Sequence, residues 1–380
     1  MNADILAPVA ASIIEARLPK HAPPSAVFAV SEGGKSYVSA AGIADLDLGS
    51  ASTRDHSFDL ASVSKLLTTL ALARMVAAGD LDTGDRIGHI LGSRAGVHAE
   101  VTIDQLLRHR AGLAEWHPVY LLPNVHEDPV RATLSVPPRY QRDSGHHYSD
   151  LGFQILGDIV SHVSGVRFDE TVRQLVLKPL RARTVTAFRP GDGTPAAAGP
   201  DGDAIEREMV RSGIPYPVDA DEKGFPWRLD TLRGTIADGN AFHAFGAAAG
   251  HAGWFSDAAG ALAIAAALGN PERIGATSAA TVAMAAEIDP GQGAGTRTYR
   301  LRWRGVERLF LGHPGFTGTF IAASPATDSE PEVLAVMLSN RLHGLPAPSR
   351  HDLSPVEDRW RDAMVLADRI LNQPTMGERP

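Results

Sequence analysis

One apolar stretch, residues 60–73, constrains the fold more than any other part of the chain. Its apolar residues recur at helical spacing, at Val63, Leu66, Leu67, Leu70 and Ala71. Gly79 provides a stop signal for this helix. Lys65 is the only charged residue between Asp59 and Arg74. The pattern therefore predicts a helix that is buried in the core and carries a single lysine.

This lysine lies next to a hydroxyl. Burial disfavours an ammonium and lowers its pKa unless a partner compensates. Ser62 precedes Lys65 by three residues, so both side chains share one helix face. A lysine that has lost its proton can activate a neighbouring hydroxyl in the first turn of a helix as a nucleophile. The free backbone N–H groups at the start of the helix are suited to stabilise an oxyanion. The spacing alone is common by chance, but a structural lysine belongs among other charges on a wet face. We therefore interpret Ser62 and Lys65 as a functional pair.

Composition narrows the class of protein. The chain has 380 residues, of which 44% are hydrophobic and 21% charged, as in soluble globular proteins of two subdomains. The net charge of −8 argues against nucleic acid as a partner. The absence of cysteine excludes disulfides and thiolate zinc sites. Residues 1–4 lack the basic region of a signal peptide, and no apolar run predicts a membrane span. We expect a cytoplasmic protein without a membrane partner; its oligomeric state stays open.

The order of elements favours the α+β class. A helix is predicted over 3–18, a β-hairpin from 27–30 and 37–40, and strands at 298–303, 307–311, 316–323 and 332–339. Ser256 can cap a helix over 257–268, and 365–371 falls in a closing helix. The simplest packing is one antiparallel sheet, flanked by helices and built from residues 1–80 and 241–380.

Residues 81–240 differ, because they predict short helices separated by long loops. The helices are expected at 102–107, capped by Thr102, at 151–163 and at 168–177. The segment 116–140 is rich in proline and aromatic residues, and 189–235 lacks apolar periodicity. Long irregular segments in a compact domain are usually binding loops. We therefore expect an inserted, mostly helical domain whose loops line a pocket, with Trp116 and Trp227 in contact with the substrate.

Two further segments are candidates for the same site. Tyr148-Ser149-Asp150 precedes a predicted helix, and the phenol of Tyr148 can accept a proton if a nearby cation lowers its pKa. The alternative is a core tyrosine with a satisfied hydroxyl. The segment 312–319 holds three glycines, which suggests close approach of a ligand or another segment. Pro314 lacks an N–H and fits an edge strand or a bulge, where free N–H groups can bind a carbonyl; the alternative is a structural turn.

Other chemistries find no support. The 15 histidines are scattered, and His109, His117 and His146-His147 match no compact zinc pattern. There is no G-x-S-x-G nucleophile elbow and no Gly-rich phosphate loop. We therefore expect no metal site and no cofactor.

Three segments together resemble a known superfamily. Ser62-x-x-Lys65, Tyr148-x-Asp150 and His313-x-Gly315 have the order and rough spacing of the motifs of serine β-lactamases and penicillin-binding proteins. The class C-like branch, with its family VIII carboxylesterases, D-amino-acid peptidases and acyltransferases, is the most similar. Segments 106–113, 250–256 and 336–341 resemble this branch too.

The resemblance implies a role for each matched residue. Ser62 is then the acylated nucleophile, and Lys65 and Tyr148 move its proton, with the identity of the base open. The backbone N–H groups of Ser62 and Phe316 form the oxyanion hole. Asp150, His313 and Gly315 contact the substrate. The implied reaction is acyl transfer from an ester or amide to Ser62 and then to water or another acceptor.

Two departures from the superfamily motifs bear on the substrate. His313 stands where a lysine usually holds a substrate carboxylate, and it is mostly neutral near pH 7. Asp150 stands where an asparagine usually donates to a substrate amide, and an ionised Asp only accepts. Asp150 can also pair with Lys65 and hold it protonated. The chemistry favours a hydrolase of small neutral esters over a β-lactamase, with an acyltransferase, an amide or D-amino-acid peptide hydrolase, or a catalytically silent binding protein as alternatives.

Overall fold

The computed structural model describes residues 5–15, 21–191, 193–345, 347–349 and 352–373. Its main element is a seven-stranded antiparallel sheet with the order β3-β2-β1-β10-β9-β8-β7. The strands are β1 (Ser25–Glu32), β2 (Lys35–Asp45), β3 (Ser50–Ala51), β7 (Arg297–Trp303), β8 (Val306–Pro314), β9 (Phe320–Ser324) and β10 (Val333–Ser339). Because β1 pairs with β10, the two ends of the chain share one sheet, as predicted.

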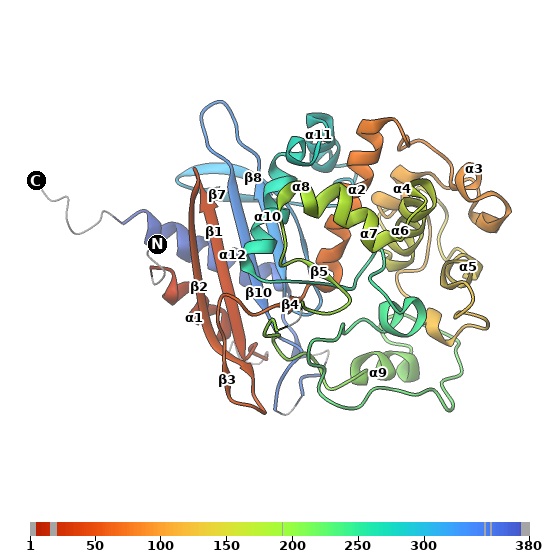
Figure 1. Ribbon diagram of the computed structural model, residues 1–380, viewed down its shortest axis with the longest axis horizontal. Helices are drawn as coiled ribbons and strands as arrows, with labels where there is room; N and C mark the ends of the chain where they lie inside the picture. The colour runs from red at the N-terminus through yellow and green to blue at the C-terminus, as the bar shows by residue number, and fades with distance from the viewer. Residues whose placement is uncertain (1–4, 16–20, 192, 346, 350–351, 374–380) are drawn as a thin grey trace, which may run out of the picture.

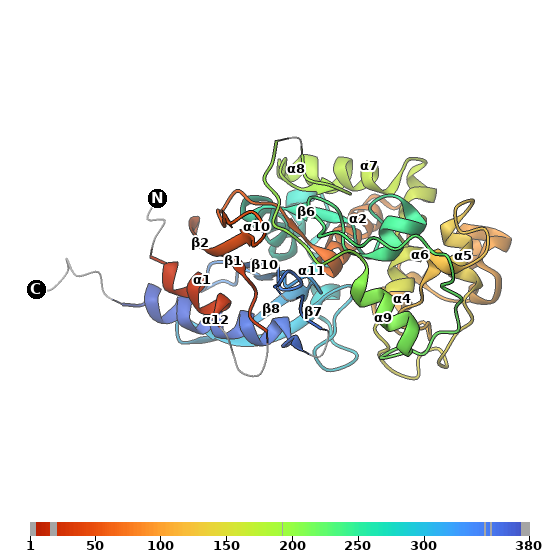
Figure 2. The same ribbon diagram turned by 90° about the horizontal axis from the view of Figure 1, so that it is seen from below.

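Helices cover both faces of this sheet (Figures 1 and 2). α1 (Ala7–Ile14) and α12 (Val356–Leu371) pack on one face, around Trp303, Phe320 and Trp360. α2 (Lys65–Ala78) and α10 (Ala258–Gly269) lie on the other. The outer ends of the helix predicted over 3–18 lie outside the described residues. The predicted cap of α10 was wrong: Ser256 belongs to strand β6 (Trp254–Ser256), and the Asp257 carboxylate accepts the Gly260 N–H instead.

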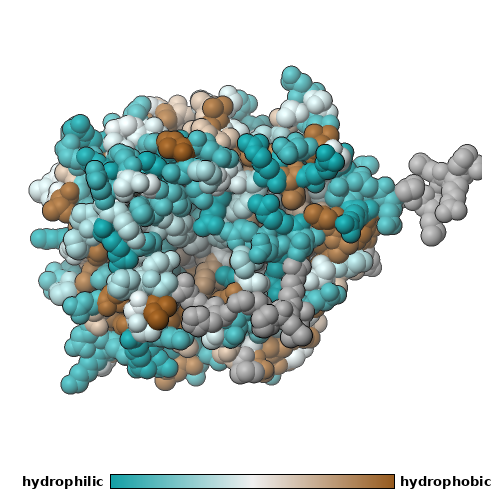
Figure 3. Space-filling view, turned by 180° about the vertical axis from the view of Figure 1, so that it is seen from behind, coloured by the Kyte–Doolittle hydropathy of each residue, from teal (hydrophilic) through white to brown (hydrophobic). Residues whose placement is uncertain are grey.

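The apolar stretch 60–73 forms the central helix. A 3-10 turn, Ala61–Ser64, leads directly into α2, which ends at Gly79 with φ of 80°. Residues Ala61–Ala78 are long and apolar enough to resemble a membrane span, but 67% of this stretch is buried inside the protein, as expected of a core helix. Figure 3 shows one outer face, where apolar side chains are scattered among hydrophilic ones.

Residues 81–240 hold the helices α3 (Ile87–Leu91), α4 (Ile103–Leu107), α5 (Pro129–Ser135), α6 (Asp150–Ser164), α7 (Phe168–Val172), α8 (Lys178–Leu180) and α9 (Ala204–Ser212). The Thr102 cap of α4 is confirmed as a capping box with Gln105. α9 corrects the expectation that 189–235 is irregular throughout. The nine residues of α9 are amphipathic, with Ile205 and Met209 on the cavity side and Val210 buried, but so short a segment between Gly- and Pro-rich stretches predicts no helix. The proposed domain boundaries at 80 and 241 stay a prediction.

A small sheet, β4-β6-β5, connects the two parts of the molecule. It joins β4 (Phe58–Asp59), just before the Ser62 turn, to β6 and to β5 (Thr186–Ala187). The remaining helix, α11 (Ser278–Ala285), precedes β7. The Ser62 turn therefore lies where the main sheet meets the helical segment.

Candidate active site

Ser62 and Lys65 lie side by side at the start of α2. The Lys65 Nζ atom donates to the Ser62 Oγ atom at 2.9 Å. Lys65 is fully buried, and its ammonium also donates to the His251 carbonyl oxygen at 3.3 Å. The predicted shared face is confirmed.

The third partner of this ammonium is Asp150, at 2.6 Å. Ser149 caps α6 and thereby fixes the position of Asp150, its first residue. Burial lowers the pKa of Lys65, but the charges of Asp150 and Tyr148 outweigh it, so this pKa lies above its ordinary value. The expectation of a lysine that readily loses its proton was therefore wrong, because Asp150 supplies the buried counter-ion. Lys65 is an ammonium in the resting site.

Tyr148 completes this group. Its ring lies 5.0 Å from the Lys65 ammonium, and the residue borders the same cavity as Ser62. Burial and the charge of Asp150 raise the pKa of Tyr148, and interactions with Lys65 and Ser62 offset this only in part, so the pKa lies above its ordinary value. The expectation that a nearby cation lowers this pKa was therefore wrong. Tyr148 thus belongs to the site rather than to the core alone.

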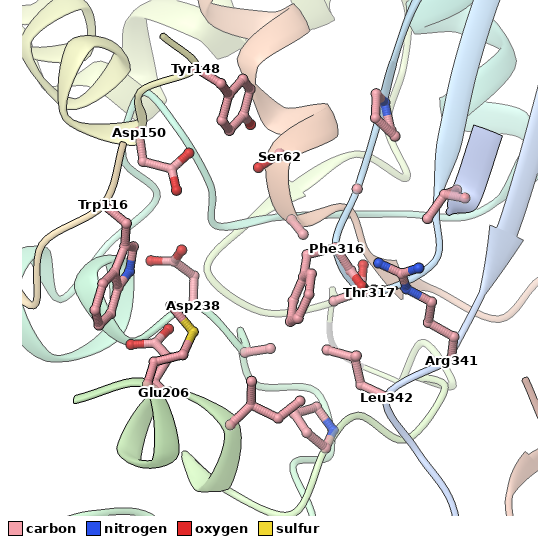
Figure 4. A pocket seen from close by; sticks show the side chains of 18 of the residues that line it. Ser62, Trp116, Tyr148, Asp150, Glu206, Asp238, Phe316, Thr317, Arg341 and Leu342 are labelled. Atoms are coloured by element: carbon pink, nitrogen blue, oxygen red, sulfur yellow. Dashed lines mark hydrogen bonds between the residues drawn. The ribbon is translucent and has the colours of Figure 1, made fainter. Parts of the chain in front are cut away.

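The second half of the site comes from the turn between β8 and β9. Phe316 lies opposite Ser62 in Figure 4. Among the hydrogen bonds of the described residues, none uses the N–H of Ser62 or of Phe316. Two free N–H groups bordering one cavity are what an oxyanion hole requires. A side chain at Gly315 would bring its Cβ within 2.5 Å of the Leu60 carbonyl oxygen, so only glycine lets this turn approach the Ser62 segment.

His313 lies near the end of strand β8, just before this turn, and is buried, with 3% of its surface exposed. Its Nδ1–H donates to the Pro314 carbonyl oxygen at 2.7 Å. Burial, together with the charges of Lys65 and Arg297, holds the pKa of His313 well below its usual value. The predicted neutral imidazole is confirmed. The prediction of an edge strand was wrong, because β8 lies between β9 and β7. Its pairing with β7 stops at Gly312, so the missing N–H of Pro314 leaves no hydrogen bond of that pair unmade.

A cavity of about 390 Å³ opens in front of Ser62. Figure 4 shows Trp116 and Asp150 on one wall and Phe316, Thr317 and Arg341 on the other. Trp116 therefore lies where the sequence placed it. Trp227 does not border the cavity; it packs against Tyr120 and Phe225 and donates to Glu222, which corrects its prediction as a substrate contact.

Four carboxylates of the cavity wall were missed: Asp203, Glu206, Asp238 and Glu357. Glu206, on α9, accepts from the Tyr120 hydroxyl at 2.9 Å and from the Gly239 N–H at 2.7 Å. Burial and the negative charge of Asp238 raise the pKa of Glu206 to about 8. Burial also acts on Asp238, but the contact with His251 at 3.0 Å outweighs it, and the pKa of Asp238 falls to about 2. None of the four belongs to a motif, so only the folded chain reveals them.

Two guanidinium groups were missed as well. Arg297 pairs with Glu357 at 2.6 Å, and Arg341 donates to the carbonyl oxygens of Phe316 and Ser354. The cavity lining holds five carboxylate side chains, those of Asp150, Asp203, Glu206, Asp238 and Glu357, against these two guanidiniums. Within the part of the chain that the structure describes, no three histidine or carboxylate side chains are grouped to hold a metal ion.

A family model described as Beta-lactamase matches residues 10–354. The chain belongs to this family. The resemblance seen in its three motifs and the β-lactamase fold are thereby confirmed. As a Beta-lactamase family member it is a hydrolase of the serine type, whose relatives include amidases, carboxypeptidases and esterases.

One curated relative and two solved structures of the same fold are similar to this chain. The N-acetylmuramyl-L-alanine amidase of Bacillus subtilis (strain 168) is 27% identical over 320 residues, which cover 75% of this chain and 68% of the relative. The solved structure of "EstCE1, a hydrolase with promiscuous acyltransferase activity" has a TM-score of 0.68 and 20% identity, covering 95% of this chain and 98% of that one. D-amino acid amidase from Ochrobactrum anthropi SV3 has a TM-score of 0.67 and 17% identity, covering 97% and 98%.

Proposed function

We propose that the protein hydrolyses small, uncharged carboxylic esters through an acyl-enzyme on Ser62. The observation that carries this proposal is the 2.9 Å contact between the Lys65 ammonium and the Ser62 hydroxyl at the cavity wall. A hydroxyl held by a buried cation beside a second proton-transfer group can attack a carbonyl carbon.

The reaction proceeds in two halves. The Ser62 Oγ atom attacks the ester carbonyl carbon. As negative charge develops on the carbonyl oxygen, this oxygen accepts hydrogen bonds from the backbone N–H groups of Ser62 and Phe316. The hydroxyl proton leaves with the help of Tyr148 and Lys65 and is returned to the departing alkoxide. Because Asp150 holds Lys65 as an ammonium, we assign the acceptor role to the Tyr148 oxygen in its ionised form; this tyrosinate takes the Ser62 proton and the resulting phenol returns it to the alkoxide. Burial and Asp150 keep the pKa of Tyr148 above its ordinary value, and the ammonium of Lys65 partly offsets this by stabilising the ionised form. Water then attacks the acyl-enzyme by the reverse path.

The preference for uncharged esters rests on the charge of the cavity. Near pH 7 the lining carboxylates are largely neutralised: Asp150 pairs with Lys65, Asp203 with Arg228 and Glu357 with Arg297, and a pKa of about 8 keeps Glu206 mostly protonated. His313 adds no positive charge. A carboxylate-bearing substrate therefore finds no cation at position 313, whereas a neutral ester needs none.

Amide hydrolysis and acyl transfer use the same acyl-enzyme and remain the second candidate. The amidase of Bacillus subtilis, the D-amino acid amidase of the same fold and the promiscuous acyltransferase activity of EstCE1 favour testing both. A silent binding protein is disfavoured because Ser62, Lys65 and Tyr148 are brought together.

The test is a panel of p-nitrophenyl esters of increasing chain length, p-nitroanilides and a cephalosporin, with Ser62→Ala as the blank. We expect an initial burst followed by turnover with short neutral esters and little with the cephalosporin. Added alcohol or amine acceptors separate transfer from hydrolysis. Turnover of the cephalosporin above that of every ester would overturn the proposed specificity.

A further inference from the structure

A carboxylate outside the motifs lies directly behind the nucleophile. Asp59, at the end of β4, accepts the Ala61 N–H on its Oδ1 atom at 2.8 Å. Its Oδ2 atom accepts the Ala237 N–H at 2.7 Å. One side chain therefore ties the turn that carries Ser62 to the segment that carries Asp238 of the cavity wall.

The turn that Asp59 holds needs such support. Ala61 has a φ of 44°, in the left-handed region that an L-residue with a Cβ rarely adopts. Ser62 follows immediately, so this backbone conformation sets the direction of its Oγ atom and of its N–H. Uncommon backbone conformations persist where surrounding contacts fix them, and they cluster at functional sites.

The same residue also contacts the other half of the oxyanion hole. The Thr317 hydroxyl donates to the Asp59 carbonyl oxygen at 2.6 Å, and the Thr319 hydroxyl donates to the Leu60 carbonyl oxygen at 3.0 Å. Thr317 directly follows Phe316. These bonds fix the distance between the Ser62 segment and the turn that carries the Phe316 N–H.

We propose that Asp59 is a positioning residue, which aligns the Ser62 and Phe316 N–H groups into an oxyanion hole by holding Ala61, Ala237 and Thr317 at once. The proposal rests on the proposed acyl-enzyme at Ser62. Asp59 touches neither the substrate nor the reacting atoms; it acts through the backbone.

The ionised carboxylate is essential to this role. Two N–H donors need two acceptor oxygens, and an asparagine has only one, so its amide group would face the second N–H. Burial raises the pKa of Asp59 to about 6, and the nearby charge of Asp238 adds to this shift, while the two N–H bonds and Arg228 oppose it. Protonation below pH 6 therefore removes one acceptor and loosens the turn. Retention of a buried charge here is understandable if it serves catalysis rather than stability.

The test compares Asp59→Asn with Asp45→Asn. Asp45 is the control, because it is also buried and also accepts backbone N–H groups, from Asp47 and Leu48, but it contacts neither the Ser62 turn nor the Phe316 turn. It also pairs with Arg233, so the folded state of Asp45→Asn is verified by circular dichroism. The readouts are the rate at which a fluorophosphonate labels Ser62 and the pH profile of kcat/KM for a p-nitrophenyl ester. We expect the fluorophosphonate to label Ser62 of Asp59→Asn roughly tenfold more slowly than Ser62 of the parent. The KM of the variant for the ester should stay within about twofold of the parental value. The control should keep the parental rates.

The pH profile separates positioning from a general loss of structure. The parent should lose activity as pH falls through about 6, and Asp59→Asn should lack this step, since an amide does not titrate there. Parental labelling and an unchanged profile in Asp59→Asn would overturn the proposal. If Asp59→Asn does not fold, the pH dependence of labelling in the parent tests the same carboxylate: the rate should fall as pH drops through about 6, and a rate that stays flat there overturns the proposal. Labelling by the fluorophosphonate needs no natural substrate. If the parent protein is labelled at Ser62 but hydrolyses no ester, the proposed function is refuted, while the test of Asp59 stays valid.

Discussion

The Lys65 ammonium lies 2.6 Å from the Asp150 Oδ1 atom, so the lysine beside the nucleophile is half of a largely buried ion pair. This contact changes the role that the lysine of the S-x-x-K motif can have in this protein. An unpaired buried lysine would have a depressed pKa and could act as a base. Paired with Asp150, it supplies a fixed positive charge next to Ser62 and Tyr148.

Asp150→Asn should therefore destabilise the protein. The variant leaves the fully buried ammonium with a neutral partner, which costs about 2 kcal/mol in the free energy of unfolding. Since the folded-state pKa of Lys65 is raised, this contribution is complete below pH 10.5 and declines as pH rises through the folded value. Urea unfolding at pH 7 and at pH 11 measures the difference. Asp289→Asn, which breaks a more exposed pair with Arg110, should cost under about 1 kcal/mol.

Ser62→Ala should abolish turnover, by at least about a thousandfold, while the fold is kept, because only the attacking hydroxyl is lost. Ser64→Ala is the matched control, since Ser64 is buried two residues away in the same turn. Mass spectrometry after fluorophosphonate treatment should place the adduct on Ser62. An adduct on Ser64 would contradict the assignment of the nucleophile.

Tyr148→Phe and Lys65→Ala should each slow acylation by several orders of magnitude, and the double variant should be little worse than the slower single one. Both groups serve one proton transfer, and residues acting as a unit are not additive. Single-turnover kinetics with a p-nitrophenyl ester measures the acylation rate. Full activity in Tyr148→Phe would remove the phenol from the mechanism.

The two tryptophans provide a contrast in the pocket. Trp116 borders the cavity, so Trp116→Ala should shift ester chain-length preference toward longer acyl groups. Trp227 is half-buried and packs on Tyr120 and Phe225, so Trp227→Ala should lower stability by about 1–2 kcal/mol and leave the preference unchanged. Relative kcat/KM values across the ester panel check both expectations. A changed preference in Trp227→Ala alone would contradict the cavity described here.

These tryptophans also show where the sequence stops being informative. Both are large aromatic residues in predicted loops, and no local pattern distinguishes one that lines a cavity from one that fills a core. The hairpin, the α2 helix and the Ser62–Lys65 pair were predictable because their signals are local in the chain.

The parts of the cavity wall that were not predicted are formed by segments far apart in the sequence. Glu206 and Asp238 belong to no motif and come together only in the fold, and α9 is a short helix of nine residues inside a Gly- and Pro-rich segment. The partner of Lys65 is 85 residues away in the chain. The motif order suggested that Asp150 could pair with Lys65, but only the folded structure gives the resulting direction of the pKa shift.

The last prediction concerns substrate charge. His313 is neutral and buried, so His313→Lys places a new positive charge at the position where a carboxylate of an anionic substrate would lie. A unit charge at such a site is worth up to a few kcal/mol, so after screening we expect roughly a tenfold gain in the cephalosporin-to-ester ratio of kcat/KM. Lys65 and Arg297 already lower the pKa of His313 and will also lower that of the new lysine, so the gain should be larger at pH 6 than at pH 9.

Asp150→Asn combined with His313→Lys extends this test, since together they restore both superfamily residues and change the local charge by about two units. The single variants are measured beside the double one, because Asp150 also neutralises Lys65. His313→Gln is the matched control, as it changes the shape of the side chain without adding charge. If His313→Lys retains ester turnover but handles the cephalosporin no better than His313→Gln, charge at this position does not select the substrate, and the preference for neutral esters loses its main physical support.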